Sequence, residues 1–368
     1  MQINLFIRGL ISVLLLGMLG SSCAQSEQPN VLPQDIPSKK VYAPALVDSV
    51  KNVRTLAKEA FFNTGNSTEE RLEAISRLGY PDNETFKALF QVAVDSNEND
   101  KVRLAALKKH RYDEKYFDKV LSILSDPNES EELVAGLIED IGRRTTFRQP
   151  AEMQQRLQNA LRERLNDSRQ SVRLAAYRIL VASHDAVAID KLVEGLRSNA
   201  SPIPLPDAID LLDMDGSNKH IVTLRPFLSN PNPDVQAQAA RALAVDPESR
   251  PTIISLANNA KAPLAVRSHA LRALSREDKG FMAYAIRLVG NSKEKADIRY
   301  EAMKGAMRRL NYQNEPAATQ VNFALAVQRL SSERGVITTD KRDVGAEAKE
   351  LFAHLLKSFP AIKKHFGN

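Results

Sequence analysis

The sequence has one cysteine, Cys23, and no tryptophan among its 368 residues. A single cysteine excludes an internal disulfide and any zinc site built on several thiolates. Aromatic residues make up only 6% of the chain, which leaves little surface for stacking nucleic-acid bases. The stability of the folded chain must therefore come from packing and not from cross-links.

Catalytic signatures are also missing. The six histidines form neither an HxxxH nor an HExxH pattern, and there is no CxxCH motif, phosphate-binding loop or GxSxG motif. Neighbouring acids such as Glu131 and Glu132 suit a helix start better than an acid–base pair. We therefore assign no catalytic, cofactor-binding or metal-ligating residue and expect no cofactor. A site assembled from distant repeats stays open, because sequence spacing does not reveal it.

The strongest pattern in the sequence is a repeated segment, seen most clearly from Val172 to Leu180. Related segments begin at residues 70, 102, 133, 172, 204, 235, 266 and 298, at intervals of 31 or 32 residues and one of 39. A near-constant period of this size is typical of a solenoid. The apolar positions within each segment have helical spacing, and a second amphipathic run follows a short break. No segment alternates with period two, so no sheet is expected.

Two positions of the repeated segment are nearly constant. The fifth residue is often alanine, as at Ala176, which lets helices approach closely. The second residue is arginine in five segments. Each arginine could bond an acid or a carbonyl in an adjacent turn and hold the stack, or the series could form an anion-binding ladder, and we favour the first reading. These arginines are Arg71, Arg103, Arg173, Arg267 and Arg299.

A turn with Asp or Asn followed by V-R-x-x-A-[LAM]-R-x-L, repeated at this period, resembles HEAT repeats. The resemblance covers roughly residues 66 to 331 and is closest to the short subtype also found in phycobilin-lyase-like proteins. It implies an all-α fold, an α-solenoid of about eight two-helix repeats with helical caps. HEAT-like repeats serve many partners, so the resemblance does not specify a function.

The start of the chain predicts export. Residues 1–22 combine a basic tip, an apolar run too short to span a bilayer and a small-residue end, and predict a signal peptide. The small residues before Cys23 resemble a bacterial lipoprotein box, which makes Cys23 the predicted lipid attachment site. Ordinary cleavage after Ala24 is the alternative. We expect a lipid-anchored protein of the cell envelope, at the outer membrane and facing the periplasm, or alternatively a soluble periplasmic or secreted one.

Four segments follow from these patterns. The signal peptide precedes a lipidated, flexible tether at 23–40, which is polar and proline-rich. Residues 41–331 form the predicted solenoid, whose first helix, about Ala43 to Phe62, caps the stack. Residues 332–368 form a loop and a capping helix near Val344 to Phe359 with a basic tail.

Candidate binding residues lie where the repeats differ. The interval of 39 contains an insertion with three arginines, which could grip an acidic partner or form a solvated turn. The second helices vary more than the first, and we expect them to line a concave groove that holds the partner. The candidate partner-binding residues are Arg143, Arg144, Arg148, Lys115, Lys119 and Lys191.

The sequence thus favours a non-enzymatic scaffold or adaptor for another envelope protein, held at the membrane by its lipid. An enzyme or a lyase-like enzyme accessory is the alternative. The formal charge of +6 is a modest excess of 51 basic over 45 acidic residues. Export and the low aromatic content argue against a nucleic-acid partner.

Overall fold

The computed structural model describes residues 44–109, 114–144, 151–216, 219–277, 280–312 and 314–367. The chain forms two compact units, residues 1–53 and 54–368. Of the first unit, only the beginning of helix α1 (Pro44–Phe62) is described. The predicted signal peptide, Cys23 and the tether lie outside the described residues.

The second unit is an all-α solenoid of HEAT-like helix pairs. Each of the eight repeated segments falls in the first helix of a pair, as predicted. These first helices are α2 (Thr68–Arg77), α4 (Asp100–Lys109), α6 (Glu131–Arg144), α8 (Gln170–Ala182), α10 (Leu205–Met214), α12 (Pro233–Ala242), α14 (Leu264–Glu277) and α16 (Ala296–Tyr312).

The second helices follow after short turns. They are α3 (Asn83–Val94), α5 (Glu114–Ser125), α7 (Ala151–Arg164), α9 (Ala186–Arg197), α11 (Ile221–Leu224) with the 3₁₀ helix η1 (Arg225–Ser229), α13 (Arg250–Asn258), α15 (Phe281–Val289) and α17 (Ala317–Ser332). Helices α18 (Val344–Ser358) and α19 (Pro360–Phe366) close the stack by packing on α17. Among the described residues there is no strand, only an isolated bridge between Ile337 and Asp343.

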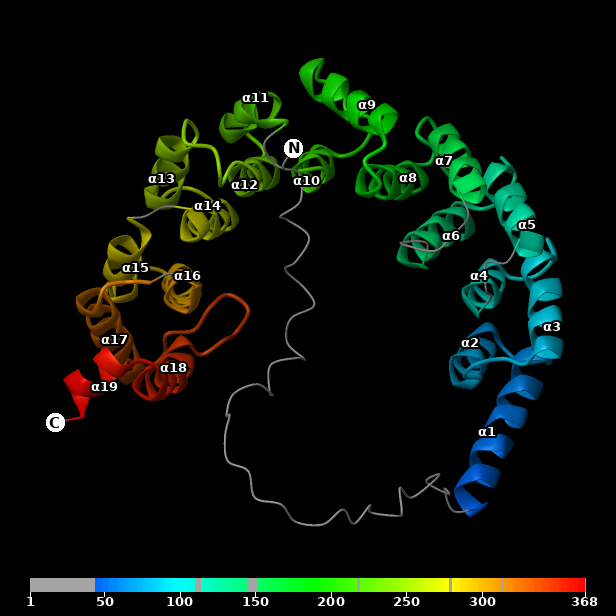
Figure 1. Ribbon diagram of the computed structural model, residues 1–368, viewed down its shortest axis with the longest axis horizontal. Helices are drawn as coiled ribbons and strands as arrows, with labels where there is room; N and C mark the ends of the chain where they lie inside the picture. The colour runs from blue at the N-terminus through cyan, green and yellow to red at the C-terminus, as the bar shows by residue number, and fades with distance from the viewer. Residues whose placement is uncertain are drawn as a thin grey trace, which may run out of the picture. The chain divides into compact units, whose positions relative to one another are not determined.

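Within the second unit, the first helices lie side by side in one row and the second helices in another (Figure 1). The first helices occupy the inner side of this unit's curve. The expectation that the second helices line a concave groove is therefore wrong. The strong Ala/Arg pattern of the first helices reflects their close contacts, such as those between α12 and α14 and between α14 and α16.

Local sequence explains where the helices begin. Ser67 and Glu70 form a capping box at α2, because each side chain accepts a hydrogen bond from the other residue's backbone N–H. Side chains of Asp82, Asp185 and Asp343 accept backbone N–H groups at the starts of α3, α9 and α18. The Asp- and Asn-containing breaks in the sequence are thus helix starts.

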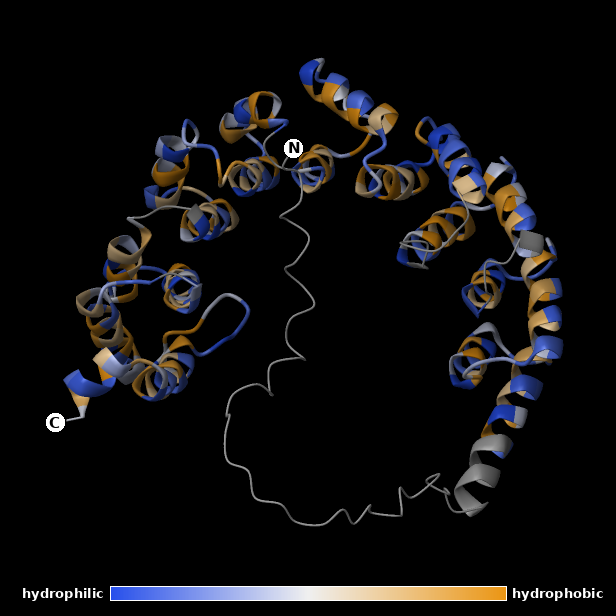
Figure 2. Ribbon diagram, in the orientation of Figure 1, coloured by the Kyte–Doolittle hydropathy of each residue, from blue (hydrophilic) through white to orange (hydrophobic). Residues whose placement is uncertain are grey.

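The core lies between the two rows. Most of the described helices carry both apolar and polar residues (Figure 2). In α8 the predicted core residues Val172, Ala176 and Leu180 have no exposed surface. Burying a leucine of this kind stabilises the fold by about 1.5–3 kcal/mol. The buried position predicted for Ala176 is confirmed.

Candidate functional site

The repeated arginines form ties inside the stack. In four of them the Nε atom donates to the backbone carbonyl ten residues earlier, near the end of the preceding helix. These four are Arg71, Arg103, Arg267 and Arg299. The guanidinium group also binds both oxygens of a glutamate in a later turn. The pairs are Arg71–Glu98, Arg103–Glu129, Arg267–Glu294 and Arg299–Glu333, with shortest N–O distances of 2.6–2.7 Å.

The pKa of Glu98, Glu294 and Glu333 is lower than that of a free glutamate. The hydrogen bonds and charge of Arg267 and Arg299 lower the pKa of Glu294 and Glu333, respectively, against the opposing effect of burial. Burial would raise the pKa of Glu98, but Arg71 lowers it overall. The four arginine side chains are buried and already paired. The reading that they hold the stack is confirmed, and they offer no free ladder for anions.

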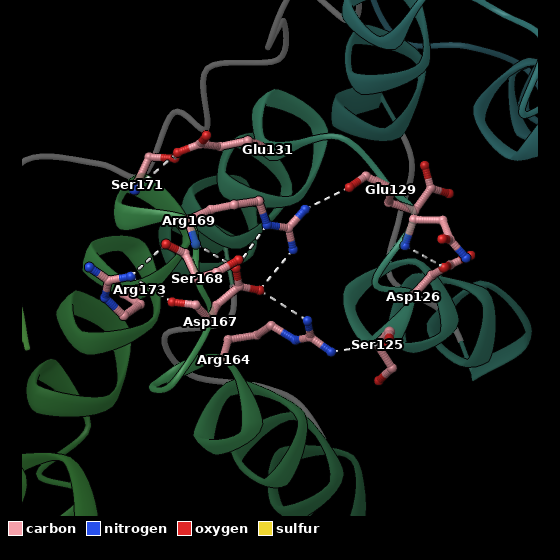
Figure 3. A network of polar contacts seen from close by, with 11 residues as sticks. Ser125, Asp126, Glu129, Glu131, Arg164, Asp167, Ser168, Arg169, Ser171 and Arg173 are labelled. Atoms are coloured by element: carbon pink, nitrogen blue, oxygen red, sulfur yellow. Dashed lines mark hydrogen bonds and ion pairs between the residues drawn. The ribbon is translucent and has the colours of Figure 1, made fainter.

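The fifth arginine, Arg173, departs from this pattern. It donates to the carbonyls of Asp167, Ser168 and Pro202 and to no carboxylate among the described residues. The turn before it is held by Asp167, whose carboxylate binds Arg164 at 3.0 Å and Arg169 at 2.7 Å (Figure 3). The hydrogen bonds from Arg169 hold the pKa of Asp167 well below its usual range.

The same network bridges the longest repeat. Arg169 donates to the carbonyl of Glu129, and Arg164 donates to the carbonyl of Ser125 (Figure 3). Ser171 binds the carboxylate of Glu131, also across the repeat. The turn before α6 is therefore tied directly to the turn before α8. The insertion leaves the contact between these turns intact.

The predicted partner-binding residues are spread over several helices. Arg143 is exposed near the end of α6, with Nη2 3.9 Å from Glu139. Lys119 is exposed on α5, and Lys191 on α9 lies 3.4 Å from the Asn166 side chain. Arg144 ends α6 and Lys115 belongs to α5, but their side chains, like the whole of Arg148, lie outside the described residues. No contact joins the described members of this set, so a shared site stays a prediction.

A hollow on the second helices is a better-defined candidate. It has a volume of about 470 Å³ and lies where α9 meets α11 and η1. Leu196 and Phe227 form its buried wall, whereas Val222 is 75% exposed. Arg197 donates to the Thr223 hydroxyl at 3.3 Å and fixes one side of the hollow. A hollow of this size and mixed character can take an apolar side chain of a partner.

Sequence reasoning missed this hollow, although a signal exists. Ile221 and Val222 are adjacent apolar residues in a very short helix whose buried residues are Thr223 and Leu224. Ile221 packs against the core, which leaves Val222 outside. The candidate residues predicted on the second helices were charged. The residue that marks the hollow is instead an apolar one, Val222, which lies off the buried side of its helix.

The described residues contain no group of three or more His, Cys, Asp or Glu side chains that could hold a metal ion. Among those residues, no helix combines the length and apolar character needed to cross a membrane.

Comparisons with known proteins give only distant likenesses. Neither a family model nor a curated protein matches the chain. The complex of CpcE and CpcF of phycocyanin lyase from Nostoc sp. PCC7120 is 17% identical, covers 89% of this chain and 100% of its own, and has a TM-score of 0.36. An engineered protein is also 17% identical, covers 83% and 99%, and has a TM-score of 0.34. Overlaps this loose carry no argument on function, and the fold rests on the helices described above.

Proposed function

We propose that this chain is a non-enzymatic scaffold that docks another protein of the cell envelope on its second helices. The observation that supports it most is the hollow between α9 and α11, where exposed Val222 lies beside the buried Leu196 and Phe227. Four of the recurring arginines of the first helices, in contrast, are paired with glutamates inside the stack. A solenoid built in this way can change its exposed residues without losing its stacking contacts.

A photo-cross-linking residue at position 222 of the full-length chain tests this proposal in cells. We expect it to cross-link to a defined envelope protein, whose purified form then binds the wild-type chain. Val222→Asp should weaken that binding at least about tenfold, because the interface would bury an unpaired charge.

Leu56→Asp is the matched control, because Leu56 is an exposed aliphatic residue on α1, far from the hollow in sequence. It should leave binding within about twofold of wild type. Cross-links from position 56 but none from position 222, or equal weakening by both substitutions, would contradict the proposed docking surface.

We also propose that Cys23 carries the lipid that holds the scaffold at the membrane. The support is the sequence alone: a lone cysteine behind an apolar run and small residues. Cys23→Ser should move the protein from the membrane fraction to the soluble fraction. Equal membrane association of both proteins would rule out the lipid anchor and favour the soluble periplasmic or secreted alternative.

The alternative, an enzyme accessory with a site assembled across repeats, has one specific observation in its favour. Side chains from α14, α16 and the loop between α17 and α18 surround a second hollow. Chemistry on a bound molecule would require turnover, whereas docking requires only binding. Product formation from a candidate substrate, abolished by substitutions in this second hollow, would favour the accessory reading.

A further inference from the structure

The second hollow is polar and lies on the inner row of helices, away from the proposed docking surface. It has a volume of about 440 Å³ and is bounded by α14, α16 and the loop at 333–343, which lies beside α16 (Figure 1). Four cationic side chains line it, against three carboxylates. The cations are Arg272, Lys304, Arg308 and Arg342, and the carboxylates are Asp297, Glu301 and Asp340.

All three carboxylates already have donors. Arg272 binds both oxygens of Glu301, at 2.8 and 2.5 Å. Asp340 accepts hydrogen bonds from Arg342 at 3.1 Å and from the Thr338 hydroxyl. Asp297 accepts from the backbone N–H of Thr339 at 3.1 Å and also from its hydroxyl. The acids of the hollow are therefore committed to holding its walls.

Two of the cations are not committed in this way. Within ion-pair distance, Lys304 and Arg308 have no carboxylate partner among the residues that the structure describes. The Lys304 Nζ atom lies 5.4 Å from the centre of the Tyr300 ring, and Arg308 Nη2 donates to the Ser275 hydroxyl at 3.2 Å. Two positive groups on successive turns of α16 thus face the hollow with bonding capacity to spare.

The electrostatics of Arg308 agree with this geometry. Burial lowers the pKa of its guanidinium group, the charge of Glu301 partly offsets this, and the positive charges of Arg272 and Arg276 lower it further. A nearby anion would relieve this unfavourable environment. The local charge is therefore matched to a negatively charged ligand.

The walls of the hollow are held in place before any ligand arrives. Arg342 Nη1 donates to the Tyr300 hydroxyl at 2.7 Å, and its guanidinium carbon lies 4.8 Å from the centre of the Tyr300 ring. The loop closes on itself through the Thr338 N–H to Arg342 carbonyl bond and the Val344 N–H to Val336 carbonyl bond, both 2.9 Å. A pre-formed site loses little conformational entropy when it binds.

We propose that this hollow, which we call the α14–α16 pocket, binds an oxyanion group of a ligand, a carboxylate or a phosphate. Arg308 and Lys304 contact the oxyanion directly, Arg308 through its planar fork of N–H donors and Lys304 as a point charge. Arg272 and Arg342, fixed by their acids, add positive potential at the sides. The site is separate from the docking surface on α9 and α11, so either proposal can fail without the other.

Isothermal titration calorimetry of the full-length protein with citrate and with pyrophosphate tests the pocket, because the two probes separate carboxylate from phosphate ligands. We expect saturable binding of at least one probe that weakens as salt rises. The double variant Lys304→Gln/Arg308→Gln should weaken it at least about tenfold, since each charged hydrogen bond is replaced by a neutral one.

The matched control is Lys261→Gln/Arg329→Gln, which removes the same charge from exposed residues outside the pocket. It should change the affinity less than about twofold. Both pairs of substituted side chains reach solvent, so unchanged circular dichroism will show that folding is intact. Equal weakening by both variants would indicate binding to general surface charge, and the absence of saturable binding to either probe would also overturn the proposal.

Discussion

The end repeats and the middle repeats of the solenoid tie their turns together with opposite arrangements of charge. In the end repeats, a buried arginine at the start of the first helix reaches a glutamate in a later turn. In the middle repeats, a buried aspartate just after the first helix accepts hydrogen bonds from an arginine or histidine side chain. These aspartates are Asp185, Asp215 and Asp246, spaced by 30 and 31 residues.

The arginine and histidine side chains that bind these aspartates connect neighbouring repeats. Asp185 accepts from Arg162 at 2.7 Å and Asp246 accepts from Arg225 at 2.8 Å. Asp215 accepts from His184 at 2.7 Å and from His220 at 2.9 Å. Arg162, His184 and Arg225 each precede the aspartate's own helix pair. The middle of the stack therefore has its own series of inter-repeat ties.

The two regions differ in which partner is buried. In the end repeats the arginine side chains are 1–7% exposed. In the middle repeats the three aspartates are 1–3% exposed, whereas their partners Arg162 and Arg225 are about a third exposed. Charged ties between neighbouring repeats recur in both regions, and several residue types supply them. When one member of an ion pair is substituted, the burial of the other member determines how unfavourable its unpaired charge becomes.

The largest effect is expected from cutting a tie in an end repeat. Arg267→Met leaves Glu294, 13% exposed, without its cation and the Ala257 carbonyl without its donor. Stranding a largely buried charge costs about 3 kcal/mol. Denaturant unfolding with hydrogen exchange at α14 and α15 would measure the loss, because a solenoid need not unfold in a single step. Arg329→Met, on an exposed face of α17, is the control, and an equal loss from it would show that the tie contributes nothing.

The end-repeat ties could be predicted from sequence because they recur in one register. Arg71, Arg103, Arg267 and Arg299 occupy the same position of the repeated segment, and their period reveals the stack before any coordinate is known. The eight first helices were found for the same reason. Regular stacking positions are under the same steric demand in every repeat, so the sequence repeats there too.

The middle ties and the pockets escaped prediction for physical reasons. Asp185 and Asp246 bind Arg162 and Arg225, each ten residues before the next repeated segment, but Asp215 binds two histidines, so the donors form no unbroken series. The α14–α16 pocket also depends on a loop that belongs to no repeat. The side of the curve that the second helices occupy was predicted wrongly, because helix periodicity gives a buried face but not the curvature of the stack.

A middle tie should show itself in the pH dependence of stability. Hydrogen bonds from Arg225, opposed by burial, lower the pKa of Asp246 to about 2 in the folded chain, against about 3.9 when unfolded. A depressed folded pKa means that the stabilisation is complete above the unfolded pKa and is lost as pH falls from about 4 towards 2. Asp246→Asn should therefore lower the free energy of unfolding by on the order of 2 kcal/mol at pH 7.

The difference between Asp246→Asn and wild type should shrink as the pH approaches 2, because protonation then removes the charge from wild type as well. Urea titrations at pH 7, 4 and 2.5 would follow it. Asp234→Asn, an exposed aspartate at the start of α12, is the control and should show little change. A difference that is constant with pH would mean that the carboxylate's charge is not what stabilises the turn.

The smallest effect is expected at Arg173, which lies in the same repeat as Asp185 and follows neither arrangement. It is half-buried, and among the described residues it donates only to backbone carbonyls, at 2.6, 2.9 and 2.9 Å. Arg173→Met strands no carboxylate, and carbonyls in turns near the surface can bond water instead. We expect a loss of about 1 kcal/mol by the same denaturant assay. A loss as large as that of Arg267→Met would mean that the carbonyl bonds, common to both arginines, hold the repeats together and that the glutamates of the end repeats are secondary.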